Sequence, residues 1–356
     1  MSNALMNRSP VEDRPQPSFS HRRLPRWAPA AIAVVSVTAG CGAGLLAGWQ
    51  SRVQWGLIAA FVFVAGTYLI TTAVEGKRQA KDRIATSLVW VCFVLAVVPL
   101  ASLAWTTVAR GLKVLDGYFL SHSMGGLQND EPGGGVYHAI IGTLEQVGLA
   151  TVMAVPIGLL TAVYLVEYGR GKLAKAVTFF VDVMTGIPSI VAGLFILSTW
   201  VLTFGMGFSG FAGSMALAIL MVPVVVRSTE EMLKLVPDEL REASLALGVP
   251  KWRTILKVVL PTAVGGITTG VMLAVARITG ETAPVLLLVS GSMFINNDPF
   301  NDVQSSLPLY VFEQYAVGTP AAVDRAWAAA LVLIAIVMLL NLLARGIARW
   351  KAPKAR

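Results

Sequence analysis

Two ionisable residues, Arg277 and Glu281, stand inside an apolar stretch of the sequence at about residues 262–289. A charged side chain at the centre of a membrane helix costs about 2.5–3.5 kcal/mol on insertion scales, so a functional role is the first explanation to consider. Their i, i+4 spacing predicts that both lie on one helix face, within reach of each other. Arg277 is the single basic residue inside an apolar run, as a route for an anion would require. The alternative is an ion pair that packs one helix against its neighbours.

Other residues near or within the apolar runs permit two interpretations each. Glu145 and Asp182 would line a cavity or sit at an interface between helices. Gly186 and Pro188 interrupt an apolar run, so they would shape a pathway or only kink a helix. The glycines at 133–135 precede another run, and their backbone N–H groups would attract an anion or simply form a flexible linker.

A polar segment at residues 237–261 has the features of two short helices. Pro237 suits a first helical position, and the two acidic residues after it favour the positive end of the helix dipole. Gly248 can adopt the left-handed conformation that ends a helix, and Pro250 can open the next one. Pro261 marks the entry to the following apolar run. We therefore expect a bent amphipathic hairpin.

Several kinds of chemistry have no support in the sequence. No G-x-x-x-x-G-K-[ST] motif occurs, so the chain does not carry its own P-loop for a nucleotide. Cys41 and Cys92 lie inside long apolar runs, which argues against a structural disulfide. The three histidines, His21, His122 and His138, show no metal-ligand spacing. We expect no cofactor, no metal and no catalytic residue.

The elements that position these residues are membrane helices. The chain is 55% hydrophobic and 13% charged, whereas soluble domains carry about 25% charged residues. A membrane span needs about 20 mostly apolar residues, which is too long for a barrel strand. Eight such runs occur, of which the sixth is short. They are roughly 28–48, 55–74, 84–108, 138–166, 175–203, 211–226, 262–289 and 326–348.

The basic residues define an orientation. If the N-terminus is cytoplasmic, 23 of the 28 Lys and Arg residues fall in the inside segments and only four fall outside. This asymmetry follows the positive-inside rule, so the net charge of +8 needs no nucleic-acid partner. The basic tail at 1–27 has the composition of a disordered segment. The polar segment at about 228–261 is then a cytoplasmic loop, and we expect the first run to be a retained span rather than a cleaved signal.

The polar segment resembles the E-A-A loop of permease subunits of binding-protein-dependent ABC importers. That pattern is E-A-A, three residues, G, nine residues and I-x-L-P, and this chain departs from it only in Ser for the second Ala and Val for Ile. The matching residues are Glu242, Ala243, Ser244, Gly248, Val258, Leu260 and Pro261. The resemblance implies that this loop docks into a groove on a separate ATPase subunit and transmits its closure to the spans.

A closer resemblance covers about residues 84–350. The stretches 164–169, 187–195, 227–237 and 276–284 are similar to the A-type permease subunits of bacterial phosphate ABC importers. The resemblance implies a six-span core at 84–350, preceded by an additional hairpin at 28–83. It implies four kinds of partner: membrane lipid, a homologous second permease, two ATPase subunits and a periplasmic phosphate-binding protein. It places the chain in a bacterial inner membrane, as a transport subunit rather than an enzyme.

Three other functions stay open at this level. One is the sister permease of the same importer, or a permease for another oxyanion, since the residues alone do not separate sulfate, molybdate and phosphate. The second is a carrier driven by an ion gradient, with Glu145, Asp182 and Glu281 as a proton relay. Such a carrier needs no dock for an ATPase. The third is a membrane scaffold without transport, which would leave the charges at 277 and 281 unexplained.

Overall fold

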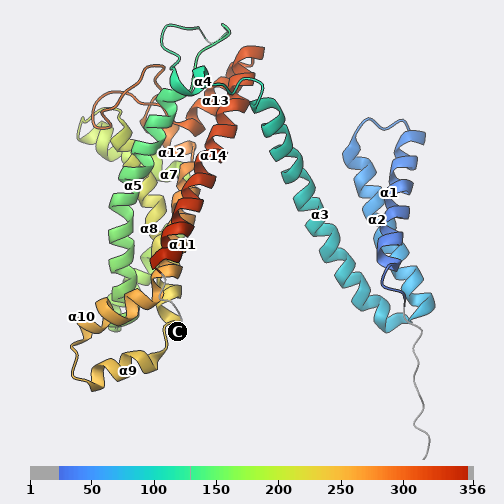
Figure 1. The fold of residues 1–356 in the computed structure, drawn as a ribbon, viewed down its shortest axis with the longest axis horizontal. Coiled ribbons are helices and arrows are strands. Elements are labelled where there is room, and N and C mark those ends of the chain that lie inside the picture. Colours follow the sequence, from blue (N-terminus) through green and yellow to red (C-terminus); the bar gives the residue numbers. More distant parts are fainter. Residues whose placement is uncertain (1–23, 129, 352–356) are drawn as a thin grey trace, which may run out of the picture. The chain divides into compact units, whose positions relative to one another are not determined.

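The computed structural model describes residues 24–128 and 130–351, and most of these residues are helical (Figure 1). No strand occurs in these ranges, where the only ladder contact is a single bridge between Ser290 and Gln304. The predicted all-α class is therefore confirmed. Most of the predicted basic tail, including His21, lies outside the described residues.

The apolar helices agree with the eight predicted runs. Within the described residues, seven helices are long and apolar enough to cross a membrane, or eight if one sharply bent pair counts as a span. Two predicted boundaries were wrong: the sixth run forms a full 25-residue helix, and the seventh ends ten residues early, at Thr279. The seven helices are Ala28–Leu46, Val53–Val74, Lys77–Gly111, Tyr137–Tyr168, Gly210–Lys234, Lys251–Thr279 and Pro320–Gly346.

The chain divides into two compact units, Met1–Leu103 and Ala104–Arg356, and the division falls inside α3 (Lys77–Gly111). In the first unit, α1 (Ala28–Leu46) packs on α2 (Arg52–Val74) through glycines. A Cβ on Gly44 would lie about 2.1 Å from the Trp55 indole ring, so the small residue permits the close approach. At the start of α3, Arg83 pairs with Glu75 at 3.3 Å. The predicted extra hairpin is thus a packed pair of helices.

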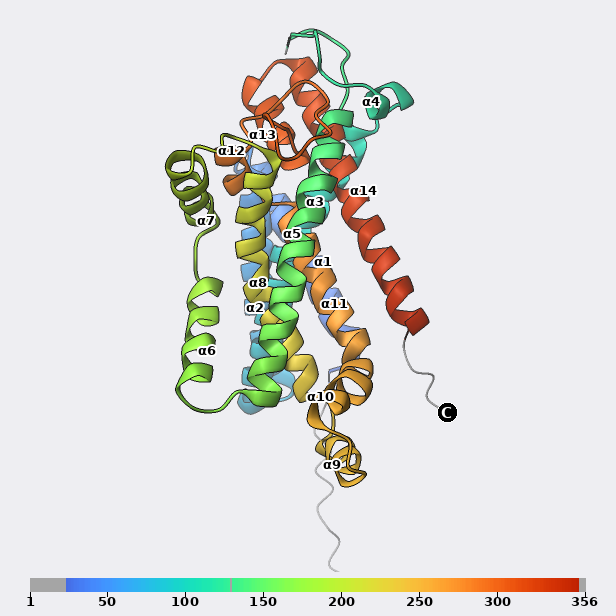
Figure 2. The ribbon, with the colours of Figure 1, turned by 90° about the vertical axis from the view of Figure 1, so that its left-hand side faces the viewer.

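In the second unit, α8 (Gly210–Lys234) is the central helix, with 67% of its most apolar window buried (Figure 2). It packs against α5 (Tyr137–Val163), where a Cβ on Gly158 would lie 2.7 Å from Val225. The other spans expose most of their apolar surface, which is the pattern of helices solvated by lipid. Further elements that pack on α8 are η1 (Tyr164–Tyr168), α6 (Gly171–Thr185), α11 (Leu260–Thr279) and α12 (Ala283–Leu288). Helix α14 (Pro320–Lys351) packs on α11.

The fifth predicted run is broken rather than straight. Helix α6 ends at Thr185 with Gly186 as its C-cap, and Pro188 is the N-cap of α7 (Ser189–Ile196). Helix α7 continues as η2 (Leu197–Thr203). The angle between α6 and the helix formed by α7 and η2 is 106°. Gly186 is a weak helix former, and Pro188 lacks an amide hydrogen and restricts the residue before it, so the two residues together favour a break at this point. The predicted interruption is confirmed.

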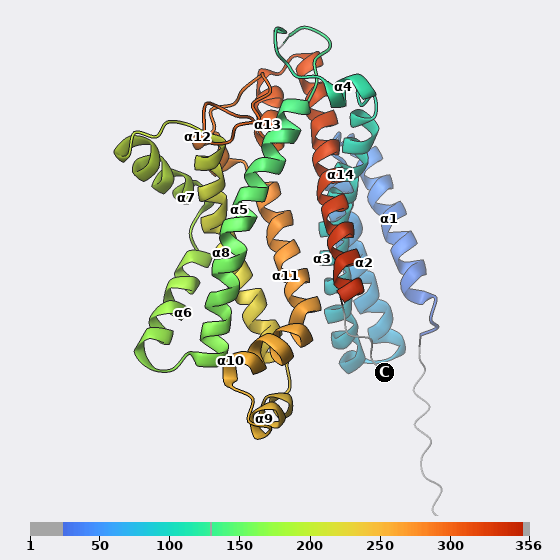
Figure 3. The same ribbon diagram turned by 60° about the vertical axis from the view of Figure 1, so that its left-hand side comes forward.

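The predicted polar hairpin lies at one end of the second unit and consists of α9 (Asp238–Ala246), α10 (Lys251–Thr254) and η3 (Ile255–Val259) (Figure 3). The π-helical η3 leads directly into α11, so that Lys251–Thr279 is one uninterrupted helix of 29 residues. We call residues 237–259 the polar hairpin. The opposite end of the unit carries α4 (Gly117–Ser121), α13 (Leu307–Val317) and the long connections (Figure 1).

At that opposite end, two of the three predicted linker glycines, Gly134 and Gly135, are buried, whereas Gly133 is exposed. Arg325, which is only 1% exposed, donates to the carbonyl oxygens of Glu131 and Gly133 at 2.7 and 3.0 Å. A Cβ on Gly135 would lie 2.2 Å from the backbone oxygen of His122. The buried glycines therefore permit close backbone packing, and the carbonyl oxygen of Gly133 helps to satisfy a buried guanidinium.

Candidate functional site

The backbone of the polar hairpin follows from its turn residues. Pro237 and Pro250 are the N-caps of α9 and α10, so α9 begins at Asp238, one residue later than expected. Gly248 has φ +74°, the left-handed conformation that its sequence position predicted. Asp238 and Glu239 occupy the first turn of α9, where the helix dipole favours negative charge. Local sequence signals thus set the bend of the hairpin.

The six predicted coupling residues divide into two groups. Glu242, Ala243, Gly248 and Pro261 are exposed, and so they are available to a partner. Ser244 and Leu260 instead face inward. The hydroxyl groups of Ser244 and Thr254 form a buried hydrogen bond of 2.9 Å that joins α9 to α10, while Leu260 packs on the core beneath the hairpin. These last two residues brace the hairpin.

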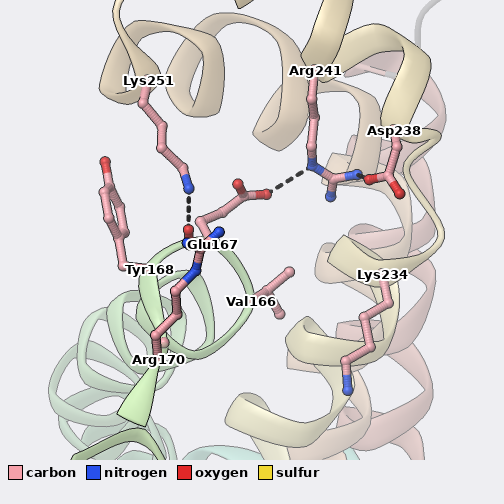
Figure 4. Close-up of a pocket in the computed structure, with 9 residues that line it drawn as sticks. Val166, Glu167, Tyr168, Arg170, Lys234, Asp238, Arg241 and Lys251 are labelled. Atoms are coloured by element: carbon pink, nitrogen blue, oxygen red, sulfur yellow. Dashed lines mark hydrogen bonds and ion pairs between the residues drawn. The ribbon is translucent and has the colours of Figure 1, made fainter.

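Arg241 holds the polar hairpin against the rest of the unit (Figure 4). Its guanidinium donates to the Glu167 carboxylate at 3.0 Å and to the Asp238 carboxylate at 2.8 Å. It also donates to the carbonyl oxygens of Leu233 and Val236, at 2.8 and 2.6 Å, where α8 ends. A planar fork with five donors is suited to such a set of acceptors. One side chain therefore connects α9, the end of α8 and η1.

Lys251 makes a second connection between the polar hairpin and the η1 region. Its ammonium group donates to the backbone oxygen of Glu167 and lies 4.9 Å from the centre of the Tyr168 ring (Figure 4). These contacts and those of Arg241 border a polar cavity of about 320 Å³. The polar hairpin is thus fixed at two points to the connection between α5 and α6.

We expect Arg241→Gln to loosen the polar hairpin without unfolding the unit. The change removes the fork and leaves a 6%-exposed Glu167 side chain without its guanidinium partner. Charged hydrogen bonds contribute about 1.5–3 kcal/mol each, so amide exchange in α9 should accelerate by roughly ten- to a hundredfold. Arg253→Gln removes the same charge from an exposed side chain that contacts Trp252, and it should leave this exchange unchanged. Unchanged exchange in the Arg241 variant would contradict the bracing role.

Arg277 and Glu281 are not the ion pair that their spacing predicted. Helix α11 ends at Thr279 with Gly280 as its C-cap, so Glu281 lies beyond the helix. Two local features favour this end: Gly280 is a weak helix former, and Pro284 lacks the amide hydrogen and suits the first turn of α12. Arg277 is exposed in the last turn of α11, and neither side chain has a hydrogen bond or ion pair with any residue that the structure describes.

The other ionisable residues near the spans are separated from each other. Asp182 on α6 pairs with Arg227 on α8, which also binds Glu230 at 2.7 Å. Glu145 accepts a hydrogen bond of 2.5 Å from Gln304, a 1%-exposed residue of the connection before α13. Asp182 and Glu145 therefore have different partners, which do not contact each other. Among the described residues, Glu281 has a hydrogen bond or ion pair with none of them. Within the part of the chain that the structure describes, no hydrogen-bonded relay joins these three carboxylates.

Sequence reasoning did not single out two features of the site. The first is the Arg241–Glu167 contact, whose partners are 74 residues apart in the chain. The second is a set of exposed apolar residues on the polar hairpin, in which Leu247 is 84% exposed. An apolar residue beside a turn glycine is the signal that would have pointed to this surface. Its members are Leu240, Leu245, Leu247, Trp252 and Leu256.

Comparison with known proteins agrees with this geometry. Residues 154–356 match the family of binding-protein-dependent transport system inner membrane components. A phosphate transport system permease protein PstA 1 of Mycobacterium tuberculosis is 50% identical over 281 residues, which cover 79% of this chain and 91% of that protein. A PstA of Yersinia pestis is 41% identical over 274 residues, which cover 76% of this chain and 91% of that one.

The fold also has a solved counterpart. A crystal structure of a bacterial ABC transporter involved in the import of alginate contains a chain that superposes with a TM-score of 0.52 at 16% identity, covering 76% of this chain and 98% of that one. This likeness concerns the fold alone. The family match and the identities above 40% over most of both proteins settle the relationship: this chain belongs to the binding-protein-dependent transport system inner membrane components of ABC importers, in the group that contains the PstA permeases.

Proposed function

We propose that this chain moves inorganic phosphate from the periplasm to the cytoplasm as one permease subunit of an ATP-driven importer. The names of its relatives, phosphate transport system permease proteins, support phosphate as the substrate. The chain would pair with a homologous second permease and receive phosphate from a periplasmic binding protein. ATP would be hydrolysed on two separate ATPase subunits, and the permease itself would carry out no covalent chemistry.

The polar hairpin supports this proposal because it combines an exposed surface with bracing contacts to the helices behind it. It presents Glu242 and Gly248 together with exposed apolar side chains, among which Leu247 and Trp252 are 84% and 54% exposed. Exposed apolar groups next to charged ones are typical of a surface that a protein partner covers. Behind this surface, Arg241 and Ser244 brace the hairpin, so that a force applied by the ATPase would reach α8 and α11.

The proposed orientation has a direct test. Glu239 and Asn297 are both exposed, and neither has a side-chain hydrogen bond within the described residues. Glu239 is on α9, which follows the end of α8, whereas Asn297 is two residues before Pro299, whose carbonyl oxygen accepts from Phe211 at the start of α8. In a background without Cys41 and Cys92, Asn297→Cys should react with an impermeant maleimide in intact cells. Glu239→Cys should react only after permeabilisation, because the positive-inside rule places it in the cytoplasm. Labelling of Glu239→Cys in intact cells would overturn the orientation and the ATPase dock together.

Arg277 is the proposed contact for phosphate. It stands at the end of α11 that is remote from the polar hairpin, which is the periplasmic end in the proposed orientation. Exposed charge at the end of a span needs a water-filled path or a partner subunit to solvate it. A guanidinium keeps its charge and can bind a tetrahedral oxyanion through two parallel hydrogen bonds. Glu281, four residues further along, would weaken binding enough to permit release.

Uptake of ³²P-orthophosphate into proteoliposomes that contain the whole importer tests the function. Uptake should require both ATP and the periplasmic binding protein, and unlabelled sulfate should not compete. Uptake that a proton gradient drives without ATP would favour the ion-gradient carrier instead. The separate positions of Glu145, Asp182 and Glu281 already count against that carrier. Preference for sulfate or molybdate would leave the permease role intact and replace only the substrate.

A further inference from the structure

The polar cavity beside the hairpin has more positive than negative side chains around it. It has a volume of about 320 Å³ and lies between the residues that follow α5 and the start of α9 and α10. Figure 4 shows the basic side chains approaching from both sides, Arg170 and Lys251 on one and Lys234 and Arg241 on the other. The ionisable residues that line it are Glu167, Arg170, Lys234, Asp238, Arg241 and Lys251.

The two carboxylates of the cavity are already engaged. Arg241 binds both Glu167 and Asp238, at 3.0 and 2.8 Å, so these three groups together leave one net negative charge. Lys234 is paired with Glu230 outside the cavity lining, at 2.7 Å. Arg170 and Lys251 are therefore the two cations of the cavity that are not paired with a carboxylate, and their charge favours an anionic ligand.

Arg170 and Lys251 both have N–H groups that are not used in hydrogen bonds to the described residues. Lys251 uses its ammonium group on a neutral carbonyl oxygen and on the face of the Tyr168 ring, neither of which neutralises it. The Arg170 guanidinium makes no hydrogen bond or ion pair with a residue that the structure describes. An arginine fork and a lysine point charge facing one polar space form an arrangement that phosphate groups bind.

We infer that this cavity is a binding site for one phosphate group, held by Arg170 and Lys251. Orthophosphate and the headgroup of an anionic phospholipid both supply this chemistry. The ligand would share the Lys251 ammonium with the Glu167 carbonyl and would bring Arg170 toward α10. Because Arg170 belongs to the α5–α6 connection and Lys251 to the polar hairpin, a bound phosphate group would join the two elements and hold the hairpin in place.

Hydrogen exchange on the full chain in nanodiscs tests this site without any transport step, so its result is independent of the proposed function. In phosphatidylcholine nanodiscs, orthophosphate should slow amide exchange at residues 166–170 and 251–254 by at least about tenfold, relative to chloride at equal ionic strength. In a second arm, nanodiscs that contain phosphatidylglycerol should slow the same amides if the ligand is a lipid headgroup.

Two double variants separate this site from general charge effects. Arg170→Gln with Lys251→Gln should abolish the slowing in whichever arm shows it. Lys172→Gln with Arg253→Gln removes the same charge from neighbouring residues that do not line the cavity, and it should preserve the effect. Slowing by orthophosphate identifies a free anion, and slowing only by phosphatidylglycerol identifies a lipid. No slowing in either arm, or equal slowing in the Arg170/Lys251 variant, would overturn the inference.

Discussion

Replacing Arg277 by glutamine is expected to reduce phosphate uptake by roughly a hundredfold or more while the importer still assembles. Two charge-assisted hydrogen bonds from one guanidinium to the substrate contribute about 3 kcal/mol or more together, which corresponds to this factor. Arg277 makes no ion pair with the described residues, so its removal leaves no buried carboxylate unpartnered and should not harm folding. Uptake of ³²P-orthophosphate by the reconstituted importer is the measurement.

Two further variants make the Arg277 prediction specific. Arg277→Lys keeps the charge but loses the planar fork, and it should restore only a small part of the uptake. The double change Arg277→Gln with Glu281→Gln should be as inactive as Arg277→Gln alone. Under the alternative of a structural ion pair, neutralising both partners would instead restore function. Near-normal uptake by the double variant would therefore reject the role of Arg277 in the anion path.

Gly248→Val is expected to impair coupling by roughly five- to 150-fold in uptake. Gly248 has φ +74°, and a β-branched residue in this region is strained by about 1–3 kcal/mol, which corresponds to that range. No atom lies within 4 Å of the position that a Cβ would occupy, so the cost comes from the backbone and not from a collision. The strain should shift Leu247 and the turn out of their docking position. Both uptake and co-purification of the ATPase subunits should fall.

Gly248→Asn is the matched control for the backbone effect. Asparagine tolerates the left-handed conformation better than other side chains, and the space around Gly248 is open, so this variant should retain most uptake. Membrane insertion should be normal in both variants, because the hairpin lies outside the apolar part of the spans. Equal losses with valine and asparagine would mean that partner contact, rather than the positive φ, determines the effect. Full uptake and normal co-purification with valine would remove Gly248 from the dock.

The features predicted correctly from the sequence are those that local chemistry determines. The spans follow from uninterrupted apolar runs, and the break at Gly186 and Pro188 follows from the missing amide hydrogen of proline. The turn at Gly248 follows from the conformational freedom of glycine. The early end of α11 was also encoded locally, in Gly280 and Pro284, but the hydropathy of the surrounding residues concealed it.

The features that were missed depend on segments meeting in space. In the sequence, Arg241 is an ordinary basic residue of an amphipathic helix. Its contacts with Glu167 and with the carbonyl groups at the end of α8 are visible only in the structure. Likewise, Asp182 looked like an intramembrane carboxylate, and only the packing of α6 on α8 brings it to Arg227. Hydropathy identifies which segments enter the membrane, but it contains no information about which of their ends touch.

The uninterrupted helix from Lys251 to Thr279 connects the polar hairpin rigidly to Arg277 at its other end. At about 1.5 Å per residue, the 26 steps from Lys251 to Arg277 correspond to roughly 39 Å. A tilt of about 5° at the α10 end would displace the guanidinium by about 3 Å, which is the length of one hydrogen bond. A small rotation at the polar hairpin would therefore be enough to make or break the proposed hydrogen bonds between Arg277 and phosphate.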